Sequence, residues 1–203
     1  MAEIVVLTAY PQMALSRVTR TLMRAAAGST PALVDVRDLY ALYPDCLIDV
    51  AAEQAALAAA RLVVWLHPVY WYSMPPLMKL WLDEVYSFGW AYGPGGYALS
   101  GKDLWLAAST GGAETAYCPS GHNRYFFDDF LHPYEQTAAL AGMRWLPPLV
   151  LHGAHRVTEA ELQAQAVVFA EHLRSYPDWP EIAELEARPA CDVPADARPA
   201  DNP

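Results

Sequence analysis

Five short runs of apolar residues recur along the chain, each about as long as one strand. They cover residues 4–7, 33–36, 62–66, 104–108 and 145–151. Continuous apolar runs of this length are typical of strands that are buried on both faces of a parallel sheet. Consecutive runs are separated by enough residues to form a helix. This alternation predicts an α/β protein with a doubly wound parallel sheet.

The helical candidates lie at about residues 14–27, 51–60, 77–88, 126–141 and 159–175. Five strands with five helices is the flavodoxin-like count. Six of the last 27 residues are proline, and seven acidic residues but only two arginines follow residue 177. We therefore expect one flavodoxin-like domain over residues 1–176 and a largely disordered tail over residues 177–203.

Composition narrows the class of protein. A chain of 203 residues with 54% hydrophobic and 18% charged residues fits one compact domain. The formal net charge of −10 argues against a surface for nucleic acid or anionic membranes. No stretch resembles a transmembrane helix and the N-terminus does not resemble a signal peptide, so we expect a cytoplasmic protein. Three widely spaced cysteines indicate neither a disulfide framework nor a zinc site.

Residues 61–92 are the most distinctive stretch of the sequence. A buried strand is followed by a proline and by an aromatic segment, residues 69–73, where a surface turn should be polar. We expect something flat and apolar to lie against this segment. Trp65 and Trp81 are best interpreted as core residues. Trp71, in contrast, follows the carboxyl end of a strand, which is where open parallel sheets bind ligands.

The helix expected after this segment is apolar over most of its circumference. Ser73 is a plausible N-cap, and Pro75 and Pro76 fit the first helical turn. Met78 and Leu82 lie on a different face from the other apolar residues of the helix and would be exposed on a lone monomer. The sequence therefore predicts that this helix lies at a subunit interface.

Several well-known motifs are absent or incomplete. Residues 96–102 spell GxxxxGK, but Asp103 stands where a P-loop needs Ser or Thr, and the loop precedes a strand. The chain has no GxGxxG after the first strand and no GxSxG nucleophile elbow. His152 and His155 have a possible metal spacing without a third ligand nearby, so we interpret them as structural residues.

The loop after the first strand has features of a phosphate site. Ser16 and Thr19 can present hydroxyl groups, and the following helix presents free N–H groups and the positive end of its dipole. Arg17, Arg20 and Arg24 lie on one face of that helix. An equally good interpretation is that Ser16 only caps the helix and that the arginines form a solvated face.

The fourth strand ends in the sequence Ser109-Thr110-Gly111-Gly112. Two glycines directly after a buried strand let the backbone approach a ligand closely or adopt a positive φ, although a tight turn without a ligand would use the same residues. In a parallel sheet of this kind the first, third and fourth strands are neighbours. Loops suited to a phosphate, an aromatic plate and polar ring edges then meet at one place. FMN is the ordinary cofactor of that shape.

A resemblance to a known family rests on three segments. They are the run HPVYWYSMPPLMKLWLDEVYSFGWAYGPGGYALSGKDLWLAASTGG, the later run LHPYEQTAALAGMRWLPPLVLHG and residues 42–57. These segments resemble the NAD(P)H:quinone oxidoreductases, and specifically the ancillary flavoproteins of glutathione-regulated potassium-efflux systems. The similarity extends from about residue 3 to about residue 176. It implies a flavodoxin-like fold, FMN, a homodimer with active sites at its interface, and two-electron, ping-pong reduction of quinones by NADPH or NADH.

The resemblance also implies a set of flavin-site residues. Relatives usually carry a histidine where this chain has Tyr10 in the first loop. Tyr117 matches a tyrosine that helps to stabilise the reduced flavin, whereas His122 is one residue away from the matching histidine position, which holds Asn123. The FMN contacts are expected at Ser16, Arg17, Val18 and Thr19 for the phosphate, at Val69, Tyr70, Trp71 and Tyr72 for the isoalloxazine ring, and at Ser109, Thr110, Gly111 and Gly112 for its pyrimidine edge.

Three hypotheses for the function remain open. The first is an FMN-dependent NAD(P)H:quinone oxidoreductase that could also activate a potassium/proton antiporter from the cytoplasmic face of the inner membrane. The second is a regulatory flavin-binding subunit of a membrane antiporter, with little turnover of its own. The third is a one-electron carrier of the flavodoxin type. The apolar helix at residues 77–88 argues against the third, because such carriers are usually monomers with exposed acidic rims.

Overall fold

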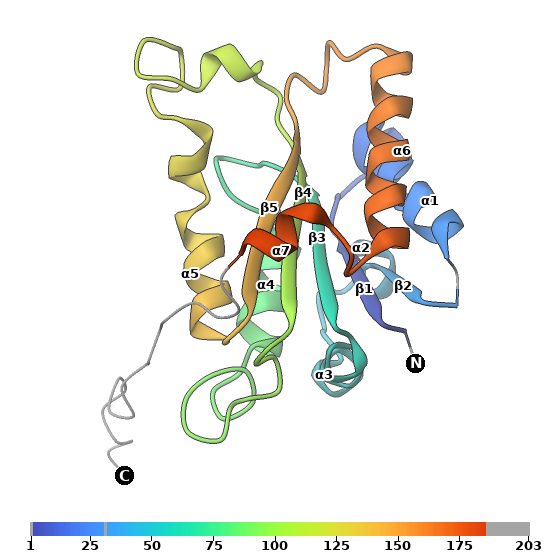
Figure 1. The fold of residues 1–203 in the computed structure, drawn as a ribbon, viewed down its shortest axis with the longest axis vertical. Coiled ribbons are helices and arrows are strands. Elements are labelled where there is room, and N and C mark those ends of the chain that lie inside the picture. Colours follow the sequence, from blue (N-terminus) through green and yellow to red (C-terminus); the bar gives the residue numbers. More distant parts are fainter. Residues whose placement is uncertain (1, 31, 186–203) are drawn as a thin grey trace.

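The computed structural model describes residues 2–30 and 32–185, and a five-stranded sheet forms their centre (Figure 1). The strands are β1 (Ile4–Thr8), β2 (Val34–Asp38), β3 (Leu62–Pro68), β4 (Asp103–Ser109) and β5 (Arg144–Leu151). Their order is β2-β1-β3-β4-β5, and every neighbouring pair is parallel. The five predicted strands and the flavodoxin-like α/β fold class are confirmed.

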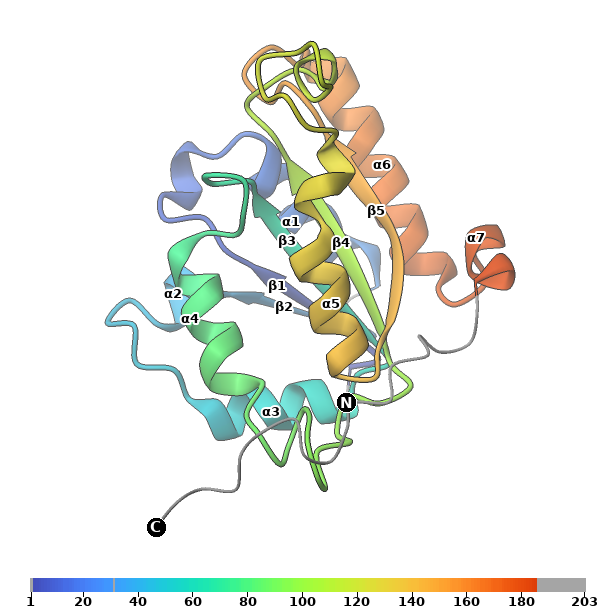
Figure 2. The ribbon, with the colours of Figure 1, turned by 90° about the vertical axis from the view of Figure 1, so that its left-hand side faces the viewer.

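Helices cover both faces of the sheet (Figure 1, Figure 2). Helices α1 (Val18–Ser29) and α6 (Glu159–Ser175) lie on one face, and α3 (Val50–Ala59), α4 (Pro76–Val85) and α5 (His132–Leu140) lie on the other. Alternate residues of β1 enter different cores, because Leu7 packs with residues of α3 and α4 while Val6 packs with residues of α1 and α6. This double burial explains why the strands are continuous apolar runs.

Short helical segments complete the described chain: η1 (Met13–Leu15), α2 (Leu39–Leu42), η2 (Glu114–Ala116), η3 (Phe127–Phe130) and α7 (Pro180–Glu184). Two of them explain helices that begin later than expected. Segment η1 and an extended Ser16 precede α1, and η3 precedes α5, in which Pro133 occupies the first turn. Among the described residues, none of the helices has both the length and the apolarity that crossing a bilayer requires.

The ends of α4 differ from the expected ones. The N-cap is Pro75 and not Ser73. Ser73 instead exchanges backbone hydrogen bonds with Tyr70, so the chain enters the helix two residues later than its sequence suggests. The helix ends at Val85, so Phe88 lies in the following loop and not on a helical face.

The apolar faces of α4 are covered within the chain itself. Met78 is 1% exposed and Leu82 is 8% exposed, because both pack into the core between α4, α3 and the sheet. Trp65 and Trp81 are fully buried in the same core, as predicted. The expectation that a lone monomer would expose Met78 and Leu82 is therefore wrong. The apolar circumference of α4 does not by itself require a second subunit.

The chain remains packed beyond the predicted end of the domain. Trp179 is 4% exposed, its ring centroid lies 4.8 Å from that of Trp105, and its Nε1–H donates to the carbonyl of His172 at 2.7 Å. Helix α7 follows directly. The expected lack of structure from residue 177 is therefore wrong for residues 177–185. The remainder of that expectation, for residues 186–203, lies outside the described residues.

Candidate functional site

The loops after β1, β3 and β4 meet at one edge of the sheet. These three strands are neighbours and parallel, so their carboxyl ends point in the same direction, upward in Figure 1. From β1 the chain continues outward to β2, and from β3 it continues to β4 on the other side. The sheet therefore has a topological switch point between β1 and β3, which is where open α/β sheets bind ligands.

The first loop holds two largely buried residues that carry hydroxyl groups, at the start of α1. Ser16 is 4% exposed and Thr19 is 2% exposed, and neither hydroxyl has a hydrogen-bond partner among the described residues. The N-cap of α1 is Arg17, so the alternative that Ser16 only caps the helix is wrong. The N–H of Thr21 donates to the carbonyl of Arg17, which is the first hydrogen bond of the helix. The N–H groups in the first turn before Thr21 therefore have no acceptor within the helix. This arrangement fits a phosphate.

The side chains of Arg17 and Arg20 hold the first loop to neighbouring segments through hydrogen bonds and an ion pair. Arg17 donates from Nη1 to the carbonyl of Val157 at 3.1 Å, and its Nη2 lies 3.4 Å from a carboxylate oxygen of Glu159. Arg20 donates to the carbonyl of Ala14 at 2.5 Å. The guanidinium of Arg17 is thus already paired, and the side chain of Val18 is buried in the core. Of the phosphate contacts predicted for Arg17 and Val18, only those through their backbone N–H groups are left open by this packing.

The second loop presents an aromatic pair on a strained backbone. Tyr70 and Ser73 exchange backbone hydrogen bonds of 2.9 and 3.0 Å, with Trp71 and Tyr72 as the two residues between them. Both central residues have positive φ, 47° for Trp71 and 63° for Tyr72, which costs a non-glycine residue ~1–2 kcal/mol. Trp71 is also 92% exposed. Backbone strain together with an exposed large ring indicates a ligand-binding surface.

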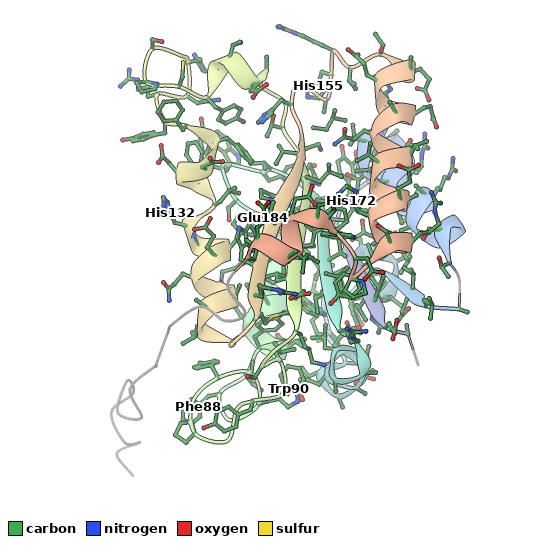
Figure 3. All side chains as sticks on the ribbon, in the orientation of Figure 1. Phe88, Trp90, His132, His155, His172 and Glu184 are labelled. Atoms are coloured by element: carbon green, nitrogen blue, oxygen red, sulfur yellow. The ribbon has the colours of Figure 1, made fainter. Side chains whose placement is uncertain are left out.

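The third loop combines buried hydroxyls with an open approach. Thr110 is buried, and its hydroxyl donates to the carbonyl of Gly112 at 2.7 Å. Neither Gly111 nor Gly112 has a positive φ. A Cβ at Gly111 would lie 3.5 Å from the ring of His155, which lies at this upper end of the molecule, and a Cβ at Gly112 would lie 3.4 Å from Tyr117 (Figure 3). A Cβ at either glycine would thus make only ordinary van der Waals contact with the described residues, and neither glycine is needed for a special backbone conformation.

The three loops are connected to one another. The N–H of Val69 donates to the carbonyl of Ser109 at 2.7 Å, which joins the second loop to the third. The rings of Tyr10 and Tyr70 meet edge to face at 6.1 Å, which joins the first loop to the second. Burial, followed by a hydrogen bond with Tyr10, raises the pKa of Tyr70 to about 12. Tyr10 thus contacts the second loop of the candidate site.

Tyr117 lies beside the third loop, as predicted. Its ring is buried and lies 5.3 Å from that of Phe127 and 5.4 Å from that of His152. Burial raises the pKa of Tyr117, and a hydrogen bond with the side chain of Thr110 acts in the opposite direction. Its hydroxyl is therefore protonated near neutral pH.

Asn123, and not His122, is the residue that reaches the site. The hydroxyl of Tyr72 donates to Oδ1 of Asn123 at 3.4 Å, and a Cβ at Gly112 would lie 3.5 Å from its Nδ2. His122 is exposed, and within the described ranges its side chain makes no hydrogen bond, ion pair or ring contact with the three loops. Asn123 thus lies beside Tyr72 and Gly112, and its amide cannot exchange a proton as an imidazole can.

Two residues of the site were missed by the sequence reasoning. Phe130 stacks on Tyr72 with centroids 5.0 Å apart and also meets Tyr117 at 6.1 Å. Its segment was predicted as part of a longer helix, which hid this role. His152 lies 3.0 Å from the hydroxyl of Thr110. Its position directly after the fifth strand was an available signal, because that strand end lies beside the fourth in a parallel sheet.

A separate groove runs between α5 and the start of β5. Its volume is about 630 Å³. None of its lining residues belongs to the three loops, so the candidate site is the loop surface and not this groove. The lining residues are His132, Pro133, Glu135, Gln136, Ala139, Met143 and Trp145.

The residues present fit FMN. The first loop offers unbonded hydroxyls and helix N–H groups to a phosphate, and the second offers an exposed aromatic surface to a flat ring. The third offers backbone groups without Cβ atoms in the way. No group of three or more His, Cys, Asp or Glu side chains in the described ranges could hold a metal ion.

Comparison with known proteins agrees with the fold. Residues 2–173 match the sequence family described as having a flavodoxin-like fold, and the chain belongs to that family. Among its named relatives, the glutathione-regulated potassium-efflux system ancillary protein KefF of Salmonella heidelberg is 43% identical over 179 residues, which are 88% of this chain and 98% of the relative.

Three solved structures extend the comparison. The general stress protein 14 of Treponema denticola, in complex with FMN, is 35% identical with a TM-score of 0.76, covering 84% of this chain and 95% of that one. An NADPH-quinone reductase from P. pentosaceus is 26% identical with a TM-score of 0.75, covering 85% and 97%. A chain described as a thermophilic tryptophan halogenase from Streptomycin violaceusniger is 39% identical with a TM-score of 0.79, covering 83% and 97%. These names cover different reactions, so the fold alone does not decide the chemistry.

Proposed function

We propose that the protein is an FMN-dependent NAD(P)H:quinone oxidoreductase. The observation that carries this proposal is the convergence of three loops, each suited to a different part of one flavin. The names of similar proteins support it, because one was solved with FMN and another is an NADPH-quinone reductase. FMN, when bound, would supply hydride transfer from NADPH or NADH to a quinone in two half-reactions.

The chain itself would bind and orient the cofactor. Ser16 and Thr19 would donate hydroxyl hydrogen bonds to the phosphate, assisted by the first N–H groups of α1. Trp71 and Tyr72 would pack against the ring and keep water away from it. Both nicotinamide and quinone are flat, so the same aromatic surface can accept them in turn.

Tyr117 would serve the polar edge of the ring. Its pKa is raised by burial, so its hydroxyl keeps its proton near neutral pH. A protonated hydroxyl can donate a hydrogen bond where negative charge develops on reduction. Asn123 would hold Tyr72 in place through the hydroxyl of that residue.

The proposal also includes two protein partners. A second copy of the chain would close the open side of the site, where Trp71 is 92% exposed. The name of the potassium-efflux relative favours a membrane potassium/proton antiporter as a further partner, contacted from the cytoplasmic face. Sedimentation equilibrium of the purified protein tests the homodimer, and a monomer at micromolar concentration would contradict it.

The decisive experiment is identification of the bound flavin. The purified protein should show the visible spectrum of an oxidised flavin, and denaturation should release FMN, identified by chromatography. Release of FAD would contradict the phosphate assignment at Ser16 and Thr19. Steady-state oxidation of NADPH or NADH should then depend on an added quinone and on flavin occupancy.

The second candidate function is a regulatory flavin-binding subunit. It is favoured by the name of the KefF relative, which describes an ancillary protein of an efflux system. In that case the protein would bind FMN and alter ion flux through an antiporter, but quinone turnover would stay near the uncatalysed rate. Measuring turnover and flux on the same preparation separates the two functions.

A further inference from the structure

His152 is the first residue after β5, and the function proposed above gives it no role. In the sheet, Ser109 of β4 lies opposite Leu151 of β5. The N–H of Thr110 donates to the carbonyl of Leu151 at 3.0 Å. His152 therefore emerges from the sheet directly beside Thr110, in the third loop of the candidate site.

The hydrogen bonds around Thr110 determine which nitrogen of His152 carries a proton. The Thr110 hydroxyl donates its single proton to the carbonyl of Gly112 at 2.7 Å. Nδ1 of His152 lies 3.0 Å from the same hydroxyl oxygen. Because the hydroxyl proton is already used, Nδ1 must be the donor of this second bond. The imidazole then carries its proton on Nδ1.

The surroundings keep this imidazole neutral and immobile. Its ring lies against that of Phe127 at 5.0 Å, edge to face, and against that of Tyr117 at 5.4 Å. Burial lowers the pKa of His152, while the nearby carboxylates of Glu114 and Asp128 act in the opposite direction. The ring is therefore held between two aromatic side chains, with its donor directed at Thr110.

Thr110 passes this constraint to the Gly112 peptide. Its hydroxyl fixes the peptide carbonyl of Gly112 by donating to it. Without the donor on His152, the hydroxyl of Thr110 could rotate and give up this bond. The Gly112 peptide would then lose its fixed orientation.

We propose that His152 is a positioning residue that, through Thr110, orients the Gly112 peptide toward the polar edge of the flavin. This inference rests on the proposed FMN-binding function. His152 does not touch the reacting atoms itself. It supplies one directed hydrogen bond to Thr110, on which the orientation of the Gly112 peptide depends.

Two substitutions separate the hydrogen bond from the packing. His152→Phe keeps a flat ring against Phe127 and Tyr117 but has no donor. His152→Asn places an amide N–H close to the position of Nδ1 and is the conservative variant. His132→Phe is the matched control, because His132 is exposed at the start of α5.

The expected result is a graded loss of FMN binding. His152→Phe should weaken FMN binding about fivefold to tenfold, which is the effect of one lost hydrogen bond, and should shift the flavin reduction potential. His152→Asn should restore the affinity to within about twofold of the unmodified protein, and His132→Phe should not change it. Unchanged affinity and potential in His152→Phe would overturn the inference.

A measurement on the flavin-free protein keeps the test independent of turnover. Long-range ¹H–¹⁵N NMR of the imidazole nitrogens should show that Nδ1 of His152 is protonated and Nε2 is not. The opposite tautomer overturns the inference, even if His152→Phe fails to fold. If the unmodified protein binds no FMN, the proposed function fails, whereas the NMR result still decides whether His152 holds Thr110.

Discussion

Ser16 and Thr19 are buried residues at the start of α1, and their hydroxyl groups have no hydrogen-bond partners among the described residues. These hydroxyls are free to donate to a ligand, and a hydrogen bond to a charged group contributes ~1.5–3 kcal/mol. Replacing either residue, as Ser16→Ala or Thr19→Val, should therefore weaken FMN binding about tenfold or more. Titration of the apoprotein with FMN, followed by flavin fluorescence, measures this effect.

The matched control for these variants is Ser29→Ala. Ser29 lies at the other end of the same helix and donates to the carbonyl of Ala26. The Ser29→Ala variant should leave the FMN dissociation constant unchanged. If all three variants bound FMN equally well, the phosphate would have to lie elsewhere.

Trp71 offers a test in which stability and binding change in opposite directions. Its φ of 47° suits glycine, and its side chain is exposed, so Trp71→Gly should raise the free energy of unfolding by ~1 kcal/mol or leave it unchanged. The same change removes the aromatic surface and should weaken FMN binding. Leu47→Gly is the control, since Leu47 is exposed without a positive φ and should lose stability but not affinity. A less stable Trp71→Gly with full affinity would contradict the assignment.

His67 links stability to pH. The residue is buried in β3, its Nδ1–H donates to the carbonyl of Pro68 at 2.9 Å, and its ring stacks on that of Tyr134 at 5.8 Å. Burial lowers the pKa of His67 to about 4 from an ordinary value of 6.5. Between these values the unfolded chain binds more protons, so stability falls as the pH drops from about 6.5 to about 4. His67 should account for a loss of ~2–3 kcal/mol near pH 4.5.

His67→Phe isolates this contribution. Phenylalanine keeps the stacking on Tyr134 and also removes Nε2, which has no partner among the described residues. Denaturant unfolding at about pH 7 and about pH 4.5 should show a smaller acid-induced loss of stability in this variant than in the unmodified chain. The exposed substitution His132→Phe should keep the full loss. Equal losses in all three proteins would mean that His67 is protonated without unfolding.

At the level of elements, the strands could be predicted from sequence because both faces of the sheet are covered and the apolar runs are continuous. The loops after β1, β3 and β4 could also be placed at one edge, because that follows from strand order. The geometry inside those loops could not be predicted from the sequence. The positive φ of Trp71 and Tyr72 and the hydrogen bond of His152 to Thr110 depend on contacts between segments that no local pattern contains. The burial of Glu53 also depends on contacts between segments that are distant in the sequence.

Glu53 of α3 is fully buried, although a carboxylate on a helix normally indicates an exposed face. It accepts hydrogen bonds from Arg37 of β2, from Tyr43 and from Trp81 of α4. These partners come from three separate parts of the chain, so their convergence on one carboxylate depends on the tertiary packing. The same packing buries α4 and explains why its apolar circumference does not by itself indicate a subunit interface.

A substitution in α4 distinguishes internal packing from a subunit interface. Leu82→Asp places an unpaired charge in a core position, which costs several kcal/mol and should lower the melting temperature strongly. Asp83→Ala, on the exposed side of the same helix, should change stability by ~0.5 kcal/mol or less. Circular dichroism melting measures both. A Leu82→Asp protein that melts normally and only changes its sedimentation would restore the interface interpretation.

At the scale of the whole molecule, the C-terminal segment closes the sheet face that α1 leaves open. The ring of Trp105 in β4 stacks on those of Phe169 and His172 in α6. The ring of Trp179 meets those of Trp105 and His172 edge to face. Tyr176 adds a hydrogen bond of 2.8 Å to Asp103 at the start of β4. The packed part of the chain therefore extends at least to Trp179 and α7, beyond the residue where the composition changes. Proline-rich composition predicts the absence of a long helix but not the burial of one tryptophan.

Two truncations test this boundary. A chain that ends at residue 176 loses Trp179, whose removal from a buried site costs ~3–5 kcal/mol, so its melting temperature should fall by about 10 °C. A chain that ends at residue 185 retains all of these contacts and should have the same melting temperature as the full-length protein. Full-length Trp179→Ala should reproduce most of the loss, because the ring and not the chain length is responsible. If the chain ending at 176 melted like the other two, the packing of Trp179 on Trp105 would contribute no stability, and the domain would end where the composition indicates.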